Sequence, residues 1–428
     1  MKFISTKQNS PAVSASDAIL QGVAPDGGLY VPQSFPHFAA DDFADAATLP
    51  ALASILFAPF FAGDRLATEL PKICQAAFNF PAPTRHVTKN LDVLELFHGP
   101  TAAFKDFGAR FMAQCIEFMS LSDEKLTILV ATSGDTGGAV GCAYEQAKTA
   151  RVVILYPKGR VSPFQQHQLT CWGDNVTALE VDGDFDDCQR LVKQAFADDK
   201  LNHACRLGSA NSINIARLLP QMSYYAFTAL AHFKRTGNLA NFIIPTGNMG
   251  NGMACLWAKT CGLPIGDIIF ATNANRALST FFATGELLPH PSVSTLANAM
   301  DVGNPSNLER YRWQNPQADN AIRCQKVSDG EISTRIRDDY KFLGQTWCPH
   351  TAIAAQIWQQ LPAQDKAQHW YIVSTAHPYK FREVVEPLIK TSIAPPAAMQ
   401  DILQRKSIKT AIPAEMSALR RELLRLCG

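Results

Sequence analysis

The sequence predicts an α/β protein with parallel sheets, because two patterns alternate along the middle of the chain. Short runs of apolar, β-branched residues are followed by a glycine-rich turn or by a stretch with helical periodicity. Runs that are apolar throughout are typical of strands buried on both faces of a parallel sheet. The predicted strands are LTILVA (126–131), VVILY (152–156), VTALEV (176–181), FIIP (242–245), IIFAT (268–272) and WYIVS (370–374).

Three other segments have the pattern of amphipathic helices that pack against such sheets. FDDCQRLVKQAFADD (185–199) and EISTRIRDDYKFL (331–343) each place their apolar side chains on one face. In the first of them these side chains are Phe185, Cys188, Leu191, Val192, Ala195 and Phe196. The tail EMSALRRELLRL (415–426) predicts a polar amphipathic helix with a capping role.

The 428 residues exceed one ordinary hydrophobic core, so we expect more than one domain. The first 90 or so residues lack the alternation of strands and helices and contain turn signals such as APDGGLYVP (24–32). A proline-rich passage, FPAPTRHV (80–87), closes this part. We therefore predict a separate N-terminal lobe, residues 1–88.

Composition and charge exclude several classes of protein. With 47% hydrophobic and 18% charged residues, the chain has the composition of a globular protein. Lys and Arg number 39 against 38 Asp and Glu, so no basic excess is available for a nucleic-acid backbone. Eleven cysteines without a C-x-x-C pair indicate a reducing compartment, and neither an export signal nor a membrane span is found. We expect a cytoplasmic protein that binds neither nucleic acid nor membranes.

Two predicted strands end in glycine-rich turns that open into helices: LVATSGDTGGAVGCAYEQA (129–147) and IIPTGNMGNGMACLWA (243–258). Glycines let a backbone approach a ligand closely, and free N–H groups at a helix start favour an anion. Each turn is a candidate phosphate or carboxylate site, although a ligand-free connection is the alternative for either alone. Neither turn is a Walker A loop or a G-x-G-x-x-G motif, and the sequence lacks H-E-x-x-H and G-x-S-x-G.

A third segment, LELFHGPTAAFKDFGARFMAQCIEFM (94–119), predicts a helix that Pro100 and Thr101 introduce. Lys105 lies in its first turn, with Gly108 about one turn later. The helix dipole and desolvation both disfavour a charged lysine there, so its amine is expected to be neutral, as a Schiff-base lysine requires. A lysine that reaches solvent along the aromatic face is the alternative. That apolar face comprises Phe104, Phe107, Phe111, Cys115 and Phe118.

Together these segments resemble the fold-type-II pyridoxal-phosphate enzymes, and more closely the threonine synthase family of the bacterial and fungal type. The matching words follow the family's order: VSASDAILQGVAPDGGLYVP (13–32), ELFHGPTAAFKDFGARF (95–111), VATSGDTGGA (130–139), SANSINIAR (209–217), IPTGNMGNG (244–252), PHTA (349–352) and STAHPYKF (374–381). The resemblance implies a tryptophan synthase β-like fold with two open parallel-sheet domains besides the lobe. The larger, cofactor-binding domain would comprise 89–110 and 215–428, and the smaller, inserted domain 111–214.

The same resemblance implies the residues that bind pyridoxal 5'-phosphate. Lys105 would carry the cofactor as a Schiff base, and Asp135 would meet its 3′-oxygen. Thr375, with Ser374 adjacent, would face the pyridine nitrogen, where a hydroxyl makes the ring a moderated electron sink. The residues expected to hold the cofactor phosphate, mainly by backbone N–H groups, are Gly247, Asn248, Met249, Gly250 and Asn251.

The substrate implied is O-phospho-L-homoserine, converted with water to L-threonine and phosphate by γ-elimination and β-addition. Lys105 would be the catalytic residue that moves protons at Cα and Cβ. Arg217 and Asn214 would clamp the substrate phosphate from one helix face, although a surface ion pair is the alternative for the arginine. The remaining residues expected to bind substrate are Ser133, Thr136 and Ser212. No metal is implied, and a monomer is favoured.

Three positions depart from the family pattern. Ile215 stands where a Trp is usual, Cys348 where an Asp is usual, and Tyr379 where a smaller residue is usual. None touches the lysine or the glycine-rich turn at 247–251, so the departures concern the shape of the substrate site. His350 and His377 are further candidates within matching words, whereas His98 is given no role.

Two other functions remain open at this stage. A serine/threonine dehydratase or a phospho-amino-acid lyase of the same fold type would release 2-oxobutyrate rather than threonine. A catalytically silent homologue would act as a binding protein. Against the silent homologue stands Lys105, because a binding module has no use for a neutral lysine beside two anion sites.

Overall fold

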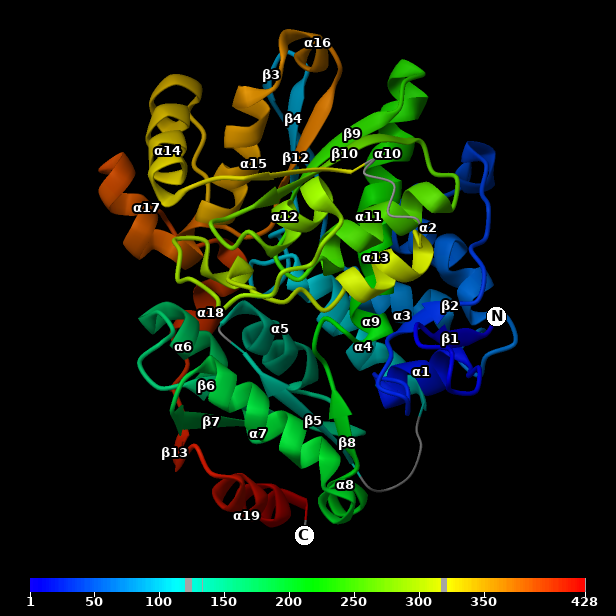
Figure 1. Cartoon of the computed structure of the whole chain (residues 1–428), viewed down its shortest axis with the longest axis vertical. Coiled ribbons are helices and arrows are strands. Elements are labelled where there is room, and N and C mark those ends of the chain that lie inside the picture. The colour runs from blue at the N-terminus through cyan, green and yellow to red at the C-terminus, as the bar shows by residue number, and fades with distance from the viewer. Residues whose placement is uncertain (120–124, 133, 317–321, 428) are drawn as a thin grey trace.

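Two parallel sheets organise the chain in the computed structural model, which describes residues 1–119, 125–132, 134–316 and 322–427 (Figure 1). The larger sheet has six strands in the order β11-β10-β9-β12-β4-β3. Its neighbours pair in parallel except β3 and β4. Its strands are β3 (Thr84–Thr88), β4 (Leu91–Glu95), β9 (Ala240–Pro245), β10 (Ile265–Thr272), β11 (Arg323–Lys326) and β12 (Trp370–Ser374).

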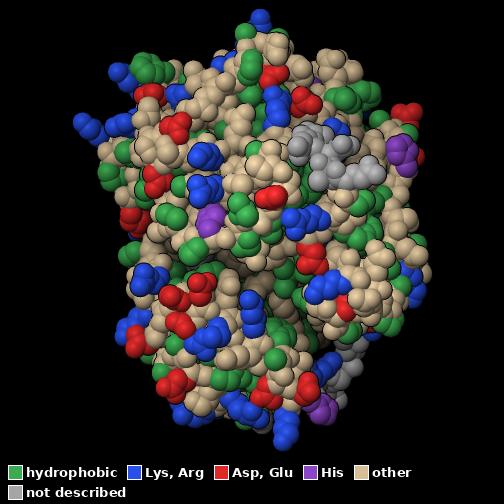
Figure 2. Space-filling model, in the orientation of Figure 1, with side chains coloured by type: hydrophobic (Ala, Val, Ile, Leu, Met, Phe, Trp, Pro, Cys, Tyr) green, Lys and Arg blue, Asp and Glu red, His purple; other side chains and the backbone are tan. Residues whose placement is uncertain are grey.

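The smaller sheet has five parallel strands in the order β13-β7-β6-β5-β8. Its strands are β5 (Leu126–Ala131), β6 (Ala150–Pro157), β7 (Val176–Asp182), β8 (Leu207–Ser209) and β13 (Thr410–Pro413). In the N-terminal part, β1 (Phe3–Ser5) and β2 (Tyr30–Pro32) form an antiparallel pair. In the space-filling view the surface is hollowed where the halves that carry the two parallel sheets meet (Figure 2).

Helices cover both parallel sheets and make up most of the N-terminal part (Figure 1). Those before β9 are α1 (Ala15–Gln21), α2 (Leu49–Phe57), α3 (Leu70–Ala77), α4 (Lys105–Met119), α5 (Asp135–Tyr144), α6 (Pro163–Thr170), α7 (Phe185–Ala197), α8 (Asp199–Cys205), α9 (Ile215–Leu218) and α10 (Met222–Thr236). Those after β9 are α11 (Gly250–Thr260), α12 (Ala277–Thr284), α13 (Leu308–Gln314), α14 (Asp329–Leu343), α15 (Pro349–Gln360), α16 (Ala363–Lys366), α17 (Arg382–Ile389), α18 (Gln400–Leu403) and α19 (Met416–Cys427). The 3-10 turns are η1 (Ala40–Phe43), η2 (Ala58–Phe61), η3 (Leu219–Gln221), η4 (Asn298–Met300), η5 (Pro378–Phe381) and η6 (Ala397–Met399).

The predicted α/β class is confirmed, and all six predicted strands exist. The predictions for 126–131 and 370–374 coincide with β5 and β12, and the other four lie within β6, β7, β9 and β10. The predicted helices correspond to α7 and α14, and the tail to α19. One member of the predicted apolar face of α4 differs: Phe118 is 36% exposed, whereas Phe107, Phe111 and Cys115 are buried.

The C-terminal segment lies elsewhere than expected. Residues 215–428 were assigned to the larger domain, but β13 pairs with β7 of the smaller sheet, and α19 buries Ala418, Leu419 and Leu423 against that sheet's core. The exposed edge of β7 needs a partner, which β13 supplies. We propose that the smaller domain comprises 111–214 together with 410–427, and that the N-terminal lobe ends before β3, which belongs to the larger sheet.

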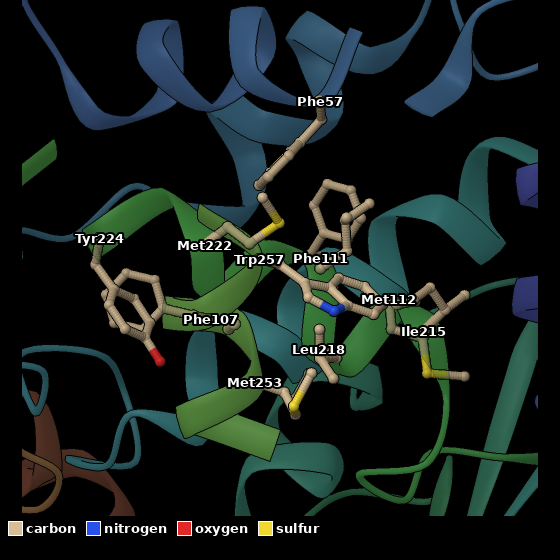
Figure 3. Close-up of a cluster of buried hydrophobic side chains, with 14 of the residues drawn as sticks. Phe57, Phe107, Phe111, Met112, Ile215, Leu218, Met222, Tyr224, Met253 and Trp257 are labelled. Carbon is tan, nitrogen blue, oxygen red and sulfur yellow. The ribbon is translucent and has the colours of Figure 1, made fainter. Parts of the chain in front are cut away.

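One continuous core joins the N-terminal lobe to both sheets. In α4, Phe111 packs edge-on against Phe57 of α2, with ring centres 5.5 Å apart. The ring centres of Phe107 and of Tyr224 in α10 lie 5.0 Å apart, and Trp257 of α11 belongs to the same cluster (Figure 3). The aromatic face of α4 is therefore packed on several elements at once, which fixes the position of the helix that Lys105 begins.

Within the described residues, no helix combines the length and the apolarity needed to cross a membrane.

Candidate active site

Three adjacent parallel strands end side by side at one edge of the larger sheet. Strand β12 lies between β9 and β4, and its residues pair in register with both. The turn 247–251 follows β9, Thr375 follows β12, and the segment leading to Lys105 follows β4. The carboxyl edge of such a sheet is where α/β proteins bind ligands. The topology thus brings together three segments that are far apart in the sequence.

Lys105 is the first residue of α4, and its side chain is half-buried. Its Nζ lies 6.0 Å from the centre of the Phe104 ring. Burial lowers the pKa of Lys105 to about 8; Lys380 and Arg217 also lower it, whereas Asp135 raises it. The amine therefore loses its proton much closer to neutrality than an ordinary lysine does.

Backbone hydrogen bonds tie the segment before Lys105 to the end of β12. They run from Leu96 N to Ser374 O (2.9 Å), from Phe104 N to Thr375 O (2.8 Å) and from His377 N to Ala102 O (3.0 Å). Within this segment Ala102 has a φ of 52°, a left-handed conformation that costs free energy for a residue with a side chain. Such strain persists where the surroundings enforce it, and here they hold Lys105 beside the central strand.

A second lysine is buried next to this position. Lys380, in η5, has an exposed fraction of 0%, and its Nζ lies 3.1 Å from Oδ1 of Asp135, the first residue of α5. Burial alone would raise the pKa of Asp135, but the charges of Lys380 and Lys105 lower it to about 2. Asp135 is therefore a carboxylate at the start of α5, where the helix dipole also favours a negative charge.

The two candidate histidines are uncharged near neutral pH, and His350 is buried whereas His377 is half-buried. Burial lowers the pKa of His350 to about 4, and Nε2 of His350 accepts a hydrogen bond from Ala299 N at 3.3 Å. Burial and the neighbouring His98 lower the pKa of His377 to about 4 as well. Nδ1 of His377 accepts from Tyr379 N at 3.2 Å and caps η5. Both histidines have structural contacts, and only His350 has Asp135 and Lys105 among the charges that influence it.

Residues 247–251, which we call the phosphate-binding loop, connect β9 to α11. Met249 is the N-cap of α11 and has a φ of 64°. The backbone N–H groups of residues 247–250 make no hydrogen bond to any described residue. A Cβ added at Gly250 would meet nothing closer than Nδ2 of Asn307 at 3.6 Å, which is an ordinary contact without a clash. The loop thus offers a row of free donors at a helix N-terminus, an arrangement that binds phosphate.

The outer side of the phosphate-binding loop is held by a network of hydrogen bonds. The Asn248 side chain donates to Ser212 Oγ at 2.6 Å and accepts from Ser306 N at 2.5 Å. Nδ2 of Asn307 donates to the carbonyl oxygens of Asn248 (3.0 Å) and Ser212 (3.3 Å). Because the Asn248 side chain is engaged here, its backbone is the part left for a ligand.

Arg310 completes this network and has an exposed fraction of 0%. Its guanidinium donates to Asn307 Oδ1, to Ile213 O at 2.6 Å and, from Nε, to Tyr30 O of β2 at 3.0 Å. Burial lowers the pKa of Arg310 to about 9. Through Arg310 the N-terminal lobe is connected to the backbone of the phosphate-binding loop.

The residues present fit the phosphate of pyridoxal phosphate. Besides the free N–H groups, the loop contains a buried donor without a partner among the described residues, Nδ2 of Asn251. Oδ1 of Asn251 accepts from the hydroxyls of Tyr224 (2.6 Å) and Tyr225 (2.8 Å), which fixes the orientation of the amide. A buried donor without an acceptor is costly, and a phosphate oxygen would satisfy it.

The residue expected at the pyridine end, Thr375, is buried directly after β12. The neighbouring Ser374 Oγ lies 3.0 Å from Thr351 Oγ1, which in turn lies 3.2 Å from Cys348 Sγ. Cys348 also caps α15 by accepting from Thr351 N at 3.5 Å, and burial raises the pKa of its thiol. The departure at position 348 therefore keeps a helix cap but places no negative charge at this end of the site.

Arg217 and Asn214, the expected clamp, have different surroundings. Arg217 is 4% exposed, donates to Ala210 O, and its Nε has no partner among the described residues. Asn214 is the N-cap of α9, and its Nδ2 donates to Ile19 O (2.8 Å) and Ser209 O (3.0 Å). Asn214 therefore does not share a helix face with Arg217, because its side chain is used to start the helix.

The other expected substrate residues are spread around the site. Ser133 lies outside the described residues. Thr136 is half-buried in the first turn of α5, beside Asp135. Ser212 lies against the phosphate-binding loop rather than near Arg217. Of the departures, Ile215 is buried in the main core and Tyr379 packs edge-on against Phe164, with ring centres 5.3 Å apart.

Reasoning from the sequence missed several residues that the structure brings to the site. Lys380 lies within the matching word STAHPYKF, and that word was its only signal. Gln168, Asn307 and Arg310 gave none, because their roles depend on contacts with residues far away in the chain.

Comparisons with known proteins agree with this geometry. The family model described as "Pyridoxal-phosphate dependent enzyme" matches residues 86–375, which include Lys105, the loop 247–251 and Thr375 at the sheet edge described above. The model "Threonine synthase N terminus" matches residues 2–78, and "Threonine synthase, C-terminal" matches residues 351–422. A threonine synthase of Serratia marcescens is 40% identical with 100% of both chains covered, and one of Escherichia coli strain K12 is 39% identical with 99% of both covered.

Solved structures show the same relationship. The crystal structure of threonine synthase from Escherichia coli has a TM-score of 0.91 at 38% identity and covers 100% of both chains. That of PLP-bound threonine synthase from Brucella melitensis has a TM-score of 0.92 at 33% identity and covers 99% of both. A serine racemase of maize, at 18% identity and a TM-score of 0.52, shares the fold alone.

Fold and site together define a pyridoxal-phosphate-dependent enzyme of fold type II that acts on a small molecule. Within that class, the chain belongs to the threonine synthase family, as the full-length similarity to its bacterial members shows.

Proposed function

We propose that the chain converts O-phospho-L-homoserine and water into L-threonine and phosphate, with Lys105 as the catalytic residue. The observation that carries this proposal is the amine of Lys105, with its pKa lowered to about 8, at the sheet edge where the phosphate-binding loop also begins. A lysine that holds a cofactor aldehyde and then moves protons has to be uncharged for part of its cycle.

The cofactor would be held at three points. Lys105 Nζ would bind its aldehyde carbon, and the backbone N–H groups of 247–250 with Nδ2 of Asn251 would bind its phosphate. Thr375 would face its pyridine nitrogen, and Asp135 its 3′-oxygen. When bound, pyridoxal phosphate withdraws electrons from Cα of the amino acid, and a hydroxyl rather than a carboxylate at the ring nitrogen moderates that withdrawal.

The substrate would be oriented by two polar regions. Ser133, Thr136 and the N–H groups at the start of α5 suit the substrate carboxylate, because a helix N-terminus favours an anion. Arg217 suits the substrate phosphate, because its guanidinium is buried with Nε unpaired among the described residues. Asn214 would position Arg217 by capping α9, and Ser212 would position Asn248.

Lys105 would perform the proton transfers. Its neutral amine would take the proton from Cα of the substrate. It would then take a proton from Cβ while phosphate leaves Cγ with the electron pair of the broken C–O bond. A proton would then be added at Cγ, the hydroxyl of water at Cβ and a proton at Cα, while the remaining proton of water goes to the released phosphate. A base whose pKa lies near the working pH transfers protons in both directions efficiently.

Replacing Lys105 by alanine tests the proposal. Lys105→Ala is expected to lose the absorbance of lysine-bound cofactor and nearly all turnover while its circular dichroism remains that of the parent. Lys366→Ala, which removes a lysine on the far α16, should retain both. The assay should measure phosphate and threonine together with 2-oxobutyrate, because 2-oxobutyrate in place of threonine would identify a dehydratase. A Lys105→Ala enzyme with parental turnover would refute the assignment.

We also propose that the protein acts as a monomer in the cytoplasm. All eleven cysteines are free thiols, as in a reducing compartment. Light scattering of the loaded enzyme measures its mass, and a stable dimer would contradict the first statement. Fractionation of cells tests the second.

A further inference from the structure

Lys380 carries a charge that is completely buried, and the mechanism above assigns it no role. Its Nζ donates to Thr101 O and to Gln168 Oε1, each at 2.7 Å, and lies 3.1 Å from Asp135 Oδ1. Burying an ammonium group costs several kcal/mol unless it is paired and hydrogen-bonded. Two hydrogen bonds and one ion pair therefore surround the ammonium group, and this environment suits its charge.

The partners of Lys380 come from both halves of the molecule. Lys380 follows β12 of the larger sheet, and Thr101 lies in the segment that leads to Lys105. Asp135 begins α5 and Gln168 lies in α6. Both helices pack on strands of the smaller sheet. The ammonium thus connects the two sheets at the point where the reactive amine lies between them.

We propose that Lys380 is a positioning residue for the chemistry at Lys105. It fixes the Asp135 carboxylate at the start of α5 and balances its charge, so that the neighbouring Lys105 is not held as an ammonium. This inference deepens the proposed function and rests on the assignment of Lys105 as the reactive amine.

The charges around Lys105 support this role. Asp135 favours its protonated form, whereas Lys380 and Arg217 disfavour it. His350 faces Asp135 and both lysines and is uncharged near neutral pH, because burial lowers its pKa to about 4. Asp106, in the first turn of α4, is influenced by Lys380 and Arg110, and burial raises its pKa. Among these groups, Asp135 is the anion that raises the pKa of Lys105. Lys380 is the direct ion-pair partner of Asp135.

A charge-balancing role and a merely structural one predict different results. Without the charge of Lys380, Asp135 acts on Lys105 uncompensated, and the pKa of Lys105 should rise. Without the charge of Asp135, the pKa of Lys105 should fall. Removing both charges should bring it back towards the parental value. A structural brace would change stability in all three variants but would not move one titration in opposite directions.

The experiment is competitive labelling of amines in the full-length chain after removal of the cofactor. The labelled peptide that contains Lys105 is quantified by mass spectrometry as a function of pH, for the parent and for Lys380→Met, Asp135→Asn and the double variant. Lys409→Met is the matched control, because it removes a lysine that lies 2.7 Å from a carboxylate, Glu180, on the smaller sheet. Methionine has about the length of lysine and suits a buried position.

Relative to the parent, the labelling midpoint of Lys105 should rise by about one pH unit in Lys380→Met and fall by a similar amount in Asp135→Asn. The double variant and Lys409→Met should remain within a few tenths of the parental midpoint. An unchanged midpoint in Lys380→Met, or shifts of the same sign in both single variants, would overturn the proposal. If Lys380→Met does not fold, two other variants decide the question. The labelling midpoint of Lys105 should fall in Asp135→Asn and should return towards the parental value when Asp135→Asn is combined with Lys380→Gln.

A separate measurement distinguishes this proposal from the proposed function. Borohydride reduction of the parental enzyme loaded with pyridoxal phosphate should attach the cofactor to Lys105. Attachment to another lysine would refute the assignment of Lys105 itself. Attachment to Lys105 without the opposite shifts would refute the role of Lys380 alone.

Discussion

The side-chain amide of Asn307 donates a hydrogen bond of 3.0 Å to the carbonyl oxygen of Asn248, in the middle of the phosphate-binding loop. This bond fixes the loop from its outer side, so that the N–H groups on the other side are presented without rearrangement. Because Arg310 holds Oδ1 of Asn307, the orientation of the amide is determined as well. A site whose donors are already in place binds an anion without spending free energy on ordering them.

We expect Asn307→Ala to weaken binding of pyridoxal phosphate by roughly ten- to a hundredfold, because the hydrogen bond from the buried Asn307 to the loop is lost at a cost of about 1–3 kcal/mol. The dissociation constant is measured by titrating the cofactor-free protein and following absorbance. Asn298→Ala, a substitution in the nearby turn η4, is the control and should change affinity little. Equal affinities of the parent and Asn307→Ala would show that the loop does not depend on this bond.

Two glycines of the phosphate-binding loop should respond differently to alanine. At Gly250 the added methyl group would make only ordinary contacts with Asn307 and Ser212, but it would lie next to the N–H group of residue 250, which is proposed to bind the phosphate. Gly250→Ala should therefore fold with parental stability or slightly better, and bind the cofactor at least tenfold more weakly. At Gly247 the methyl group would approach the Cα of Met300 to 2.7 Å, so Gly247→Ala should lower the melting temperature. Melting curves without cofactor, combined with cofactor titrations, separate the two effects.

Arg217→Ala should impair use of the phosphorylated substrate far more than cofactor binding. The buried guanidinium has a free donor among the described contacts, and loss of a charge-assisted pair with phosphate should lower kcat/KM by a hundredfold or more. Arg217→Lys keeps the charge but not the fork of donors and should recover part of the loss. Steady-state kinetics and a cofactor titration on the same preparations decide this, and equal losses in both would contradict the clamp.

Acid should destabilise the protein through its buried histidines. The pKa of His350 is about 4 in the folded chain against an ordinary value of 6.5, so between these values the unfolded chain binds more protons. The free energy of unfolding should then fall as the pH decreases from about 6.5 to about 4, by roughly 3 kcal/mol from this residue. In His350→Asn the fall should be smaller, whereas the exposed His203→Asn should keep the parental slope. Urea titrations across this pH range provide the measurement, and identical slopes in the parent and His350→Asn would refute the prediction.

The sequence was most informative where one segment carries its own signal. Strands β5 and β12 are almost entirely apolar because both faces are covered, and their limits could be read directly. Strand β4 was not predicted, because Asp92 interrupts its apolar run. That carboxylate is accommodated by His86 and His369, at 3.0 and 3.1 Å, and no local pattern reveals such contacts.

In the candidate site, too, residues with a local sequence signal could be predicted, whereas residues that depend on distant contacts could not. Lys105 and the loop 247–251 stand in short motifs whose chemistry is local, and both lie at the carboxyl edge of the larger sheet. Asn214 was assigned to a helix face, although an asparagine directly before a helix is a preferred N-cap, and the structure uses it so. Lys380 could not be assigned, because the burial of its charge depends on Asp135, which precedes it by more than half the chain.

The pairing of β13 with β7 has a consequence for how the protein is made. Strands β5 to β8 leave the ribosome long before the residues that cover the edge of β7 are synthesised. During that interval the nascent chain exposes an unpaired strand edge and the apolar surface that α19 later covers, which is a surface on which chains aggregate. A messenger RNA truncated before the codons for β13 would therefore yield a polypeptide that contains Lys105 and the whole phosphate-binding loop but depends on chaperones to stay in solution.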